Sequence, residues 1–257
     1  NRFVVFNHWN SPRLPSEEIL TLLAAGERGI WIGTSTGLAL FDGRAWNVPV
    51  FADADTVPLV VNSLAAGKND AIWVGTSRGL FWLPASGTAI RVEDWNENRA
   101  VDCLASVSGS RVWAAGETGE IFLLGTQPQD GMERLTQVPG RVRAIQQWKD
   151  RVWIAATSGL FQVKQAGGQA EKVSLPRECI PNCLIPGTEK GMWVGTRDRG
   201  LLHLGPEGTT SSYQPDLDTG SVLSLLLDGQ ENLWAGTEVA GLLRLHKSCV
   251  PGLVEES

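Results

Sequence analysis

Apolar and polar residues follow one another along this chain in short runs that recur at a fixed interval. The stretch 30–38 reads Ile-Trp-Ile-Gly-Thr-Ser-Thr-Gly-Leu, and it returns at 72–80 as Ile-Trp-Val-Gly-Thr-Ser-Arg-Gly-Leu. The residues beside each tryptophan are β-branched or small, which is typical of a buried strand. A turn that ends in glycine follows, and then a second apolar run at 38–41 or 80–83. The pattern predicts short antiparallel strands joined by hairpin turns.

The same unit occurs six times, and its tryptophans are separated by 42, 40, 40, 40 and 41 residues. A period of about 40 to 45 residues with strand-like units is the signature of propeller blades. We therefore predict an all-β protein, a six-bladed β-propeller with four antiparallel strands per blade, forming a single domain over residues 1–257. The tryptophans that anchor the six blades are Trp31, Trp73, Trp113, Trp153, Trp193 and Trp234. We expect each ring to fill the gap between adjacent blades, since a tryptophan buries about 150–250 Å².

Each blade is expected to end in a weaker, more polar strand at its edge. Such fourth strands are predicted at 45–50, 89–92, 133–138, 172–175 and 211–214. The sixth repeat has none, whereas residues 2–7 precede the first repeat in the corresponding place. We expect this N-terminal strand to close the last blade, because its pairing there would remove exposed sheet edges.

Positions counted back from the tryptophan describe the first strand of each blade. Ten residues upstream the side chain is small in five repeats, as expected where blades converge and space is tightest. These six residues are Thr21, Ser63, Cys103, Arg143, Cys183 and Ser224. Arg143 breaks the rule, so a guanidinium is expected in a crowded place. One position earlier the polar residues are Asn62, Asp102 and Asn182, against Leu20, Val142 and Leu223.

The turn after each tryptophan strand ends in a glycine, which suits a position that needs positive φ. The six glycines are Gly37, Gly79, Gly119, Gly159, Gly200 and Gly241. The last two turns, 197–200 and 238–241, are one residue longer than the others.

The motif Leu/Ile-Trp-Ile/Val-Gly-Thr-x-x-Gly-Leu, with a Ser-Leu strand ten residues upstream, resembles the two-component regulator propeller repeat. The match is strongest at 31–42, 73–83 and 193–204, and it is partial at Trp113 and Trp153, where Ala-Gly and Ala-Ala replace Gly-Thr. The resemblance implies a sensor domain of the kind found in hybrid two-component histidine kinases, which is typically extracytoplasmic. Sensors of that family usually carry more and larger propellers, followed by a membrane helix and signalling domains. The shared motif consists of packing and turn residues, so it carries over no functional site.

Composition and net charge limit the classes of partner that we expect this chain to bind. The 257 residues are 42% hydrophobic and 19% charged, and the net charge of −6 gives no general attraction to nucleic acid or to an anionic membrane. No apolar run approaches the ~18 residues needed to span a bilayer. The chain begins at Asn1 with no secretion-signal pattern and enters an apolar stretch at once, so we expect a mature product or an excised domain. Periplasm and cytoplasm both remain open, with the resemblance favouring the periplasm.

The sequence contains no recognisable catalytic or metal-binding pattern. His8, His203 and His246 have no ligand spacing to acidic residues or cysteines, and are interpreted as surface or rim residues. The chain has no G-x-S-x-G motif, phosphate-binding loop or calcium loop. We interpret the four cysteines, Cys103, Cys179, Cys183 and Cys249, as buried or loop thiols, with a Cys179–Cys183 disulfide as the alternative. We therefore predict no catalytic residues, no metal, no cofactor and no enzymatic activity.

Ligand contacts are expected where turns after the tryptophan strands and connections into the first strands share one face at the mouth of the channel. Arginine there supplies a planar fork suited to carboxylate or phosphate, although solvated turn charges are the alternative interpretation. The candidate ligand-binding residues are Arg143, Arg141, Asn62, Asp102, Asn182, Arg78, Arg197 and Arg199.

The leading hypothesis is a non-enzymatic recognition module that senses a small molecule or peptide and passes the signal to a signalling domain or partner protein. A protein–protein interaction scaffold is the first alternative, and it predicts an exposed apolar patch. A propeller lyase or hydrolase is the second, disfavoured because one tyrosine and three scattered histidines supply no catalytic cluster. We expect no contact of this domain with nucleic acid or membrane.

Overall fold

A computed structural model describes residues 4–52, 58–95, 99–107, 111–164, 167–175, 178–187, 191–205, 210–213 and 220–245. The chain divides into two compact units, an N-terminal unit Asn1–Leu135 and a C-terminal unit Thr136–Ser257. The single domain over 1–257 stays a prediction. No helix in the described ranges is long and apolar enough to span a membrane.

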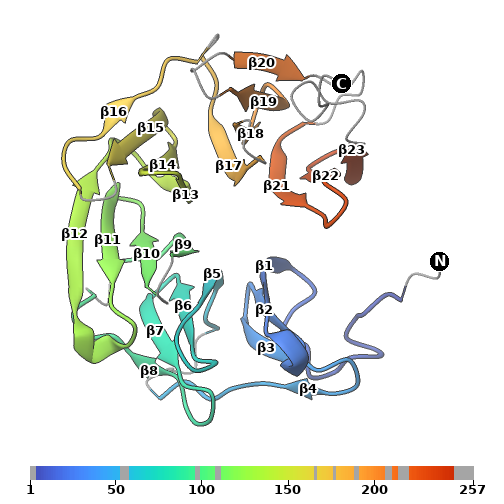
Figure 1. The fold of residues 1–257 in the computed structure, drawn as a ribbon. Coiled ribbons are helices and arrows are strands. Elements are labelled where there is room, and N and C mark those ends of the chain that lie inside the picture. Colours follow the sequence, from blue (N-terminus) through green and yellow to red (C-terminus); the bar gives the residue numbers. More distant parts are fainter. Residues whose placement is uncertain are drawn as a thin grey trace. The chain divides into compact units, whose positions relative to one another are not determined.

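The first three sheets, each of four strands in sequence order, belong to the N-terminal unit except for the last two residues of β12 (Figure 1). Blade one consists of β1 (Ile19–Ala24), β2 (Ile30–Thr34), β3 (Gly37–Phe41) and β4 (Trp46–Asn47). Blade two consists of β5 (Val61–Ala66), β6 (Ile72–Thr76), β7 (Gly79–Leu83) and β8 (Ile90–Arg91). Blade three consists of β9 (Cys103–Ser106), β10 (Val112–Ala115), β11 (Glu120–Leu124) and β12 (Met132–Gln137). Two 3-10 turns, η1 (Gly26–Arg28) and η3 (Pro128–Asp130), lie between strands.

The C-terminal unit holds the other three sheets. Blade four consists of β13 (Val142–Trp148), β14 (Arg151–Ala156), β15 (Gly159–Lys164) and β16 (Glu171–Lys172). Blade five consists of β17 (Pro181–Pro186), β18 (Met192–Thr196), β19 (Leu201–Leu204) and β20 (Thr210–Tyr213). Blade six consists of β21 (Val222–Leu227), β22 (Leu233–Thr237) and β23 (Leu242–Leu245).

These sheets confirm the predicted fold class, an all-β, six-bladed β-propeller. All strand pairs named above are antiparallel, and each sheet runs from its first strand to its last in chain order. The five predicted fourth strands are present as β4, β8, β12, β16 and β20. Within each unit the first strands of neighbouring blades contact one another, so each unit presents three first strands side by side.

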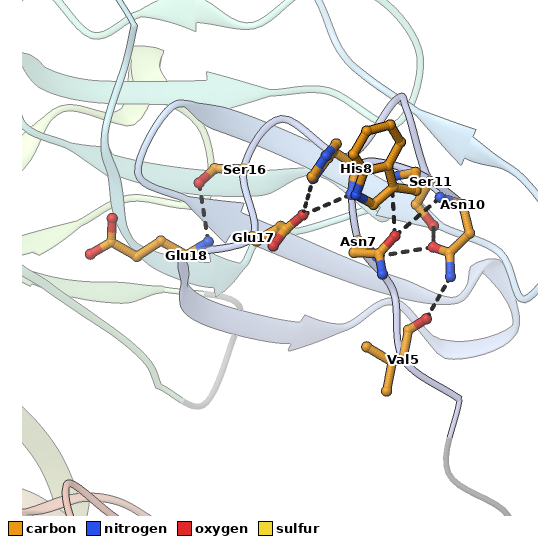
Figure 2. Close-up of polar contacts among 9 residues, drawn as sticks. Val5, Asn7, His8, Asn10, Ser11, Ser16, Glu17 and Glu18 are labelled. Atoms are coloured by element: carbon orange, nitrogen blue, oxygen red, sulfur yellow. Dashed lines mark hydrogen bonds and ion pairs between the residues drawn. The ribbon is translucent and has the colours of Figure 1, made fainter.

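The predicted N-terminal strand over 2–7 is wrong for the residues that the structure describes. Residues 4–7 lie outside any strand, and the sheet of blade six has three strands in the described part of the chain. Local hydrogen bonds hold this segment in a turn, as Figure 2 shows: the Asn7 carboxamide oxygen accepts from the backbone N–H of Asn10 at 3.2 Å, and the Asn10 side chain donates to the Val5 carbonyl at 2.7 Å. Asparagine side chains that bond the nearby backbone in this way compete with strand pairing. Phe6 also packs edge-on against Phe41 of blade one, with ring centroids 5.1 Å apart.

Four of the six repeated tryptophans, Trp31, Trp73, Trp153 and Trp193, pack against the neighbouring blade of their unit, as predicted. Trp31 belongs to a core cluster with Val61 and Val74 of blade two, and Trp193 belongs to one with Val222 and Leu233 of blade six. Trp73, Trp113 and Trp193 each expose only 1% of their surface. Burying rings of this size contributes a large share of the apolar area removed from water on folding.

The glycine and the threonine of the motif have separate structural roles. A Cβ added to Gly75 would lie 2.7 Å from Val101 Cγ1, so the close approach of blade three requires glycine there. The Thr76 hydroxyl donates to the Gly79 carbonyl at 2.7 Å and accepts from the Arg78 backbone N–H at 3.1 Å, which ties the hairpin turn. Thr34, Thr196 and Thr237 donate to the corresponding glycine carbonyls. The motif is thus a packing and turn motif, as the sequence indicated.

The turn glycines behave as predicted in five blades. Gly79, Gly119, Gly159, Gly200 and Gly241 have positive φ. Gly37 does not, so that part of the prediction is wrong; there an added Cβ would contact Pro15 at 3.3 Å.

Candidate functional site

In blades one, two, four, five and six, the turn after the second strand is bonded to the residue that leads into the first strand of the same blade. The Thr157 N–H donates to the Arg141 carbonyl at 3.0 Å, and the Arg197 N–H donates to the Ile180 carbonyl at 2.8 Å. The same bond links Ser35 to Glu18, Ser77 to Val60, and Glu238 to Ser221. We call the surface formed by these turns and entry residues the turn face. The predicted gathering of turns and entry connections is therefore present within each unit.

A β-bulge marks the start of the first strand. In blade two, Val61 pairs with Thr76 and Ser63 pairs with Gly75, which leaves Asn62 as the extra residue. The equivalent extra residues are Leu20 in blade one, Arg143 in blade four, Asn182 in blade five and Leu223 in blade six. Asp102 precedes Cys103 at the same place in blade three. In the five blades whose register shifts there, the bulge turns its side chain away from the regular alternation of the strand, so these positions can be occupied by large or polar residues.

The predicted placement of Arg143 at a crowded position is therefore wrong. In blade four Trp153 pairs with Gln146, seven residues upstream, whereas in blade two Trp73 pairs with Ala65, eight residues upstream. This difference comes from the turn between the first and second strands. In blade four that turn has two residues, 149–150, whereas in blade two it has three residues, 68–70, which the backbone bond between Gly67 and Ala71 closes.

Counting back from the tryptophan consequently moves every first-strand residue of blade four by one position. Ala144, paired with Ala155, occupies the small-residue position, and Arg143 occupies the exposed bulge. Arg143 then belongs with the polar bulge residues Asn62, Asp102 and Asn182.

Two of the predicted ligand contacts have a structural role between blades. The Asn62 side-chain N–H donates to the Val101 carbonyl of blade three at 3.1 Å. The Asn182 side-chain N–H donates to the Val222 carbonyl of blade six at 2.9 Å. Both side chains are half-buried, and each amide joins the start of one first strand to the next.

The structure places the other predicted arginines on turns. Arg141, Arg197 and Arg199 are exposed on the turn face of the C-terminal unit, whereas Arg78 is half-buried in the N-terminal unit. The pKa of the Glu238 carboxyl is lowered by hydrogen bonds from Ser221 and, to a smaller extent, by the positive charge of Arg197. The two longer turns, of blades five and six, thus bring the positive charge of Arg197 near the negative charge of Glu238.

The turn face of the C-terminal unit contains a cavity of about 680 Å³ at the junction of blades four and five. Its walls are the turn after β14, the segment from β16 toward β17, and the turn after β18. The lining residues are Thr157, Ser158, Gly159, Leu160, Lys172, Val173, Ser174, Leu175, Glu178, Cys179, Ile180 and Asp198. A volume of this size is in the range of small-molecule sites.

Arg141, Arg197 and Arg199 lie next to lining residues of this cavity without lining it themselves. The Arg141 N–H donates to the hydroxyl oxygen of Thr157 at 3.1 Å, and Arg197 and Arg199 flank Asp198 in sequence. Lys172, Glu178 and Asp198 are not among the predicted site residues, because they occupy different positions of their repeats. Only the position of Asp198 in a lengthened turn could have pointed to it.

The described cysteines and histidines show no catalytic arrangement. Cys103, Cys179 and Cys183 are free thiols; burial raises the pKa of Cys183 to about 12, and burial followed by the Asp198 charge raises that of Cys179. The Cys179–Cys183 disulfide is thus absent, while Cys249 and His246 lie outside the described residues. His203 is buried against Trp193, so its predicted surface position is wrong, and burial lowers its pKa. The part of the chain that the structure describes has no group of three or more His, Cys, Asp or Glu side chains that could hold a metal ion.

No protein-family model and no curated protein matches this chain. Among solved structures, it is similar to the extracellular domain of the hybrid two-component system BT3049 of B. thetaiotaomicron, with 19% identity and a TM-score of 0.74, over 91% of this chain and 34% of that one. The extracellular domain of the hybrid two-component system BT4673 of B. thetaiotaomicron matches with 20% identity and a TM-score of 0.72, over 91% of this chain and 32% of that one.

The chain is also similar in fold, at lower sequence identity, to an enzyme. The catalytically inactive H270A virginiamycin B lyase of Staphylococcus aureus with quinupristin matches with 12% identity and a TM-score of 0.75, over 89% of this chain and 81% of that one. All three likenesses show the propeller fold. The chain spans about a third of the length of the two extracellular sensor domains.

Proposed function

We propose that this chain is a non-enzymatic recognition module that senses a small molecule or peptide on the turn face of its C-terminal unit. The observation that carries this proposal is the cavity between blades four and five, which has charged groups on its walls and predicted arginines at its border. The fold is shared with extracellular domains of two-component systems, which supports a sensing role and an extracytoplasmic location. Binding at the junction of two blades would be passed to a signalling domain or partner protein.

A thermal-shift screen of the purified chain against sugars, organic acids, nucleotides, amino acids and peptides tests the proposal. A ligand that binds only the folded state raises the melting temperature as its concentration exceeds its dissociation constant. The Ser174→Trp variant should abolish the shift, since Ser174 lines the cavity and indole would fill it. Gln169→Trp is the matched control, because Gln169 is exposed and does not line the cavity.

The bulge positions are tested separately by Arg143→Ser. If this variant abolishes ligand binding while Ser174→Trp retains it, the ligand binds at the bulges and the cavity is not the site. If no compound in the screen shifts the melting temperature, the sensing proposal fails.

A protein-interaction scaffold is the second candidate, favoured by the apolar side chains exposed before blade one. Val4 and Val5 each expose 69% of their surface and Trp9 exposes 83%. Exposed apolar residues that are contiguous in this way are typical of interaction surfaces. Co-purification of a partner that is lost in Trp9→Ser and retained in Ser174→Trp would favour the scaffold over the sensor.

A further inference from the structure

The cavity between blades four and five carries charges of opposite sign on different blades. Lys172 comes from β16 at the edge of blade four, while Glu178 and Asp198 come from the entry and the turn of blade five. Within the described ranges, neither the Lys172 side chain nor the Glu178 side chain takes part in an ion pair or hydrogen bond. The positive charge of Lys172 and the negative charge of Glu178 therefore do not neutralise each other in the cavity.

Lys172 lies beside a glycine, whereas Asp198 is held in place by a hydrogen bond and an ion pair. The Lys172 side chain lies across Gly159, where an added Cβ would be 2.8 Å from Lys172 Cε. Asp198 Oδ1 accepts a hydrogen bond from the Ile180 N–H at 3.1 Å, and its Oδ2 lies 3.7 Å from Arg199 Nε. A substituent at position 159 would displace the lysine, so the glycine that shapes the turn also leaves room for the ammonium group.

The remaining walls are largely apolar or hydroxylated. Val173, Leu175 and Ile180 are half-buried and contribute hydrocarbon surface to the cavity. The Ser158 hydroxyl is engaged as donor to the Pro139 carbonyl. A ligand that complements this arrangement has a negative end, a positive end and an apolar body between them.

Deepening the proposed sensing function, on which this step rests, we infer that the cavity binds a zwitterionic amino acid or short peptide. The ligand carboxylate faces Lys172, and its ammonium group faces Glu178 and Asp198. Charge-assisted hydrogen bonds of this kind are about twice as strong as neutral ones. A ligand with a single charge leaves the opposite wall unpaired, so the cavity discriminates against simple anions and cations.

Isothermal titration calorimetry with the dipeptide Leu-Leu, its N-acetyl form and its C-terminal amide tests this inference. The wild-type protein should bind the free dipeptide roughly tenfold or more tightly than either blocked form, because each block removes one charged contact. Lys172→Gln should bind the free dipeptide and the amide with equal affinity. Glu178→Gln should reduce the difference between the free dipeptide and the N-acetyl form. Lys164→Gln is the control, since Lys164 is exposed on the same blade and does not line the cavity.

Equal binding of all three dipeptides by the wild-type protein overturns the inference, as does undiminished discrimination in Lys172→Gln. Unchanged melting temperatures of the variants exclude misfolding as the cause. L-leucine, Gly-Gly and tri-leucine extend the series, and absence of binding by every zwitterion also overturns the inference. If a sugar or dicarboxylate binds instead and Ser174→Trp removes that binding, the sensing function stands and only the ligand class fails. If nothing in the screen binds, both fail.

Discussion

The substitution Gly236→Ala measures how strongly the close contact between the first two strands of a blade constrains the sequence. Gly236 pairs with Ser224 in blade six, and an added Cβ would lie 2.5 Å from Ser224 Oγ and 3.8 Å from Ser224 Cβ. Only the hydroxyl oxygen is too close, and it can rotate about χ1. Overpacking costs about 1–3 kcal/mol, so we expect a loss near the lower end of this range.

The double variant Gly236→Ala/Ser224→Ala should recover the lost stability. Without the hydroxyl, the nearest atom of residue 224 is a Cβ at 3.8 Å, an ordinary van der Waals distance. Blade four already contains this combination as the Ala144–Ala155 pair. Replacing a glycine whose φ is not positive also restricts the unfolded chain, which adds about 0.4–1 kcal/mol in favour of the double variant.

Gly75→Ala is the contrasting substitution. Its Cβ would lie 2.7 Å from Val101 Cγ1, 3.1 Å from Val101 Cβ and 3.3 Å from the Val101 carbonyl oxygen, so no single rotation relieves the overlap. We expect a cost near the upper end of about 1–3 kcal/mol. Guanidinium unfolding followed by tryptophan fluorescence gives the unfolding midpoint of each variant. The midpoints themselves are compared, and not free energies of unfolding, because a chain of two compact units need not unfold in two states. The reasoning is refuted if Ser224→Ala fails to rescue Gly236→Ala, or if Gly75→Ala is no more costly than Gly236→Ala.

Substitutions at three further positions test other parts of the structure. Asp228 accepts hydrogen bonds from the Trp234 indole at 2.9 Å and from the following turn, so Asp228→Ala should lower the melting temperature. Hydrogen bonds from the Asn232 side chain, followed by the Trp234 indole and the turn backbone, lower the pKa of Asp228. Its stabilisation is therefore present above the unfolded carboxyl pKa of about 3.9 and is lost as the pH falls below that value. The stability of Asp228→Asn should depend less on pH in this acid range than the stability of the wild type. In blade one, Ala25 occupies the place that Asp228 has in blade six, and the buried Trp31 indole N–H has no hydrogen-bond partner among the described residues. In Ala25→Asp the new carboxylate should accept a hydrogen bond from that N–H. We expect this to raise the free energy of unfolding by about 1 kcal/mol. Trp9→Ser should change it by less than about 0.5 kcal/mol, since Trp9 is 83% exposed.

Repeat spacing was sufficient to predict the fold because packing residues recur at every blade. Trp31, Trp73 and Trp193 each pack against the following blade, and Gly33, Gly75 and Gly195 each face a valine at the start of that blade, so their pattern carries the architecture. The N-terminal segment was mispredicted because its apolar residues are typical of a strand, while the side chains of Asn7 and Asn10 stabilise a turn.

The candidate site was only partly predictable, for two physical reasons. Arg143 was assigned to the wrong position because a tryptophan reports the register of the second strand, and the turn before it differs in length between blades. The cavity charges Lys172 and Glu178 arise from an edge strand and a connection, where no repeat constraint applies. The sequence therefore indicated the face and some of its arginines, but not the cavity they border.

The short turn at 149–150 has a consequence for how such a chain can be modified. Blade four lacks one residue that blade two has at 68–70, yet Arg143 and Asn62 occupy the same bulge, because strand pairing and not turn length determines their position. The turns between first and second strands can therefore gain or lose residues without disturbing the turn face. They are suitable points for inserting a peptide tag, a fluorophore or new chain ends while the recognition surface is left unchanged.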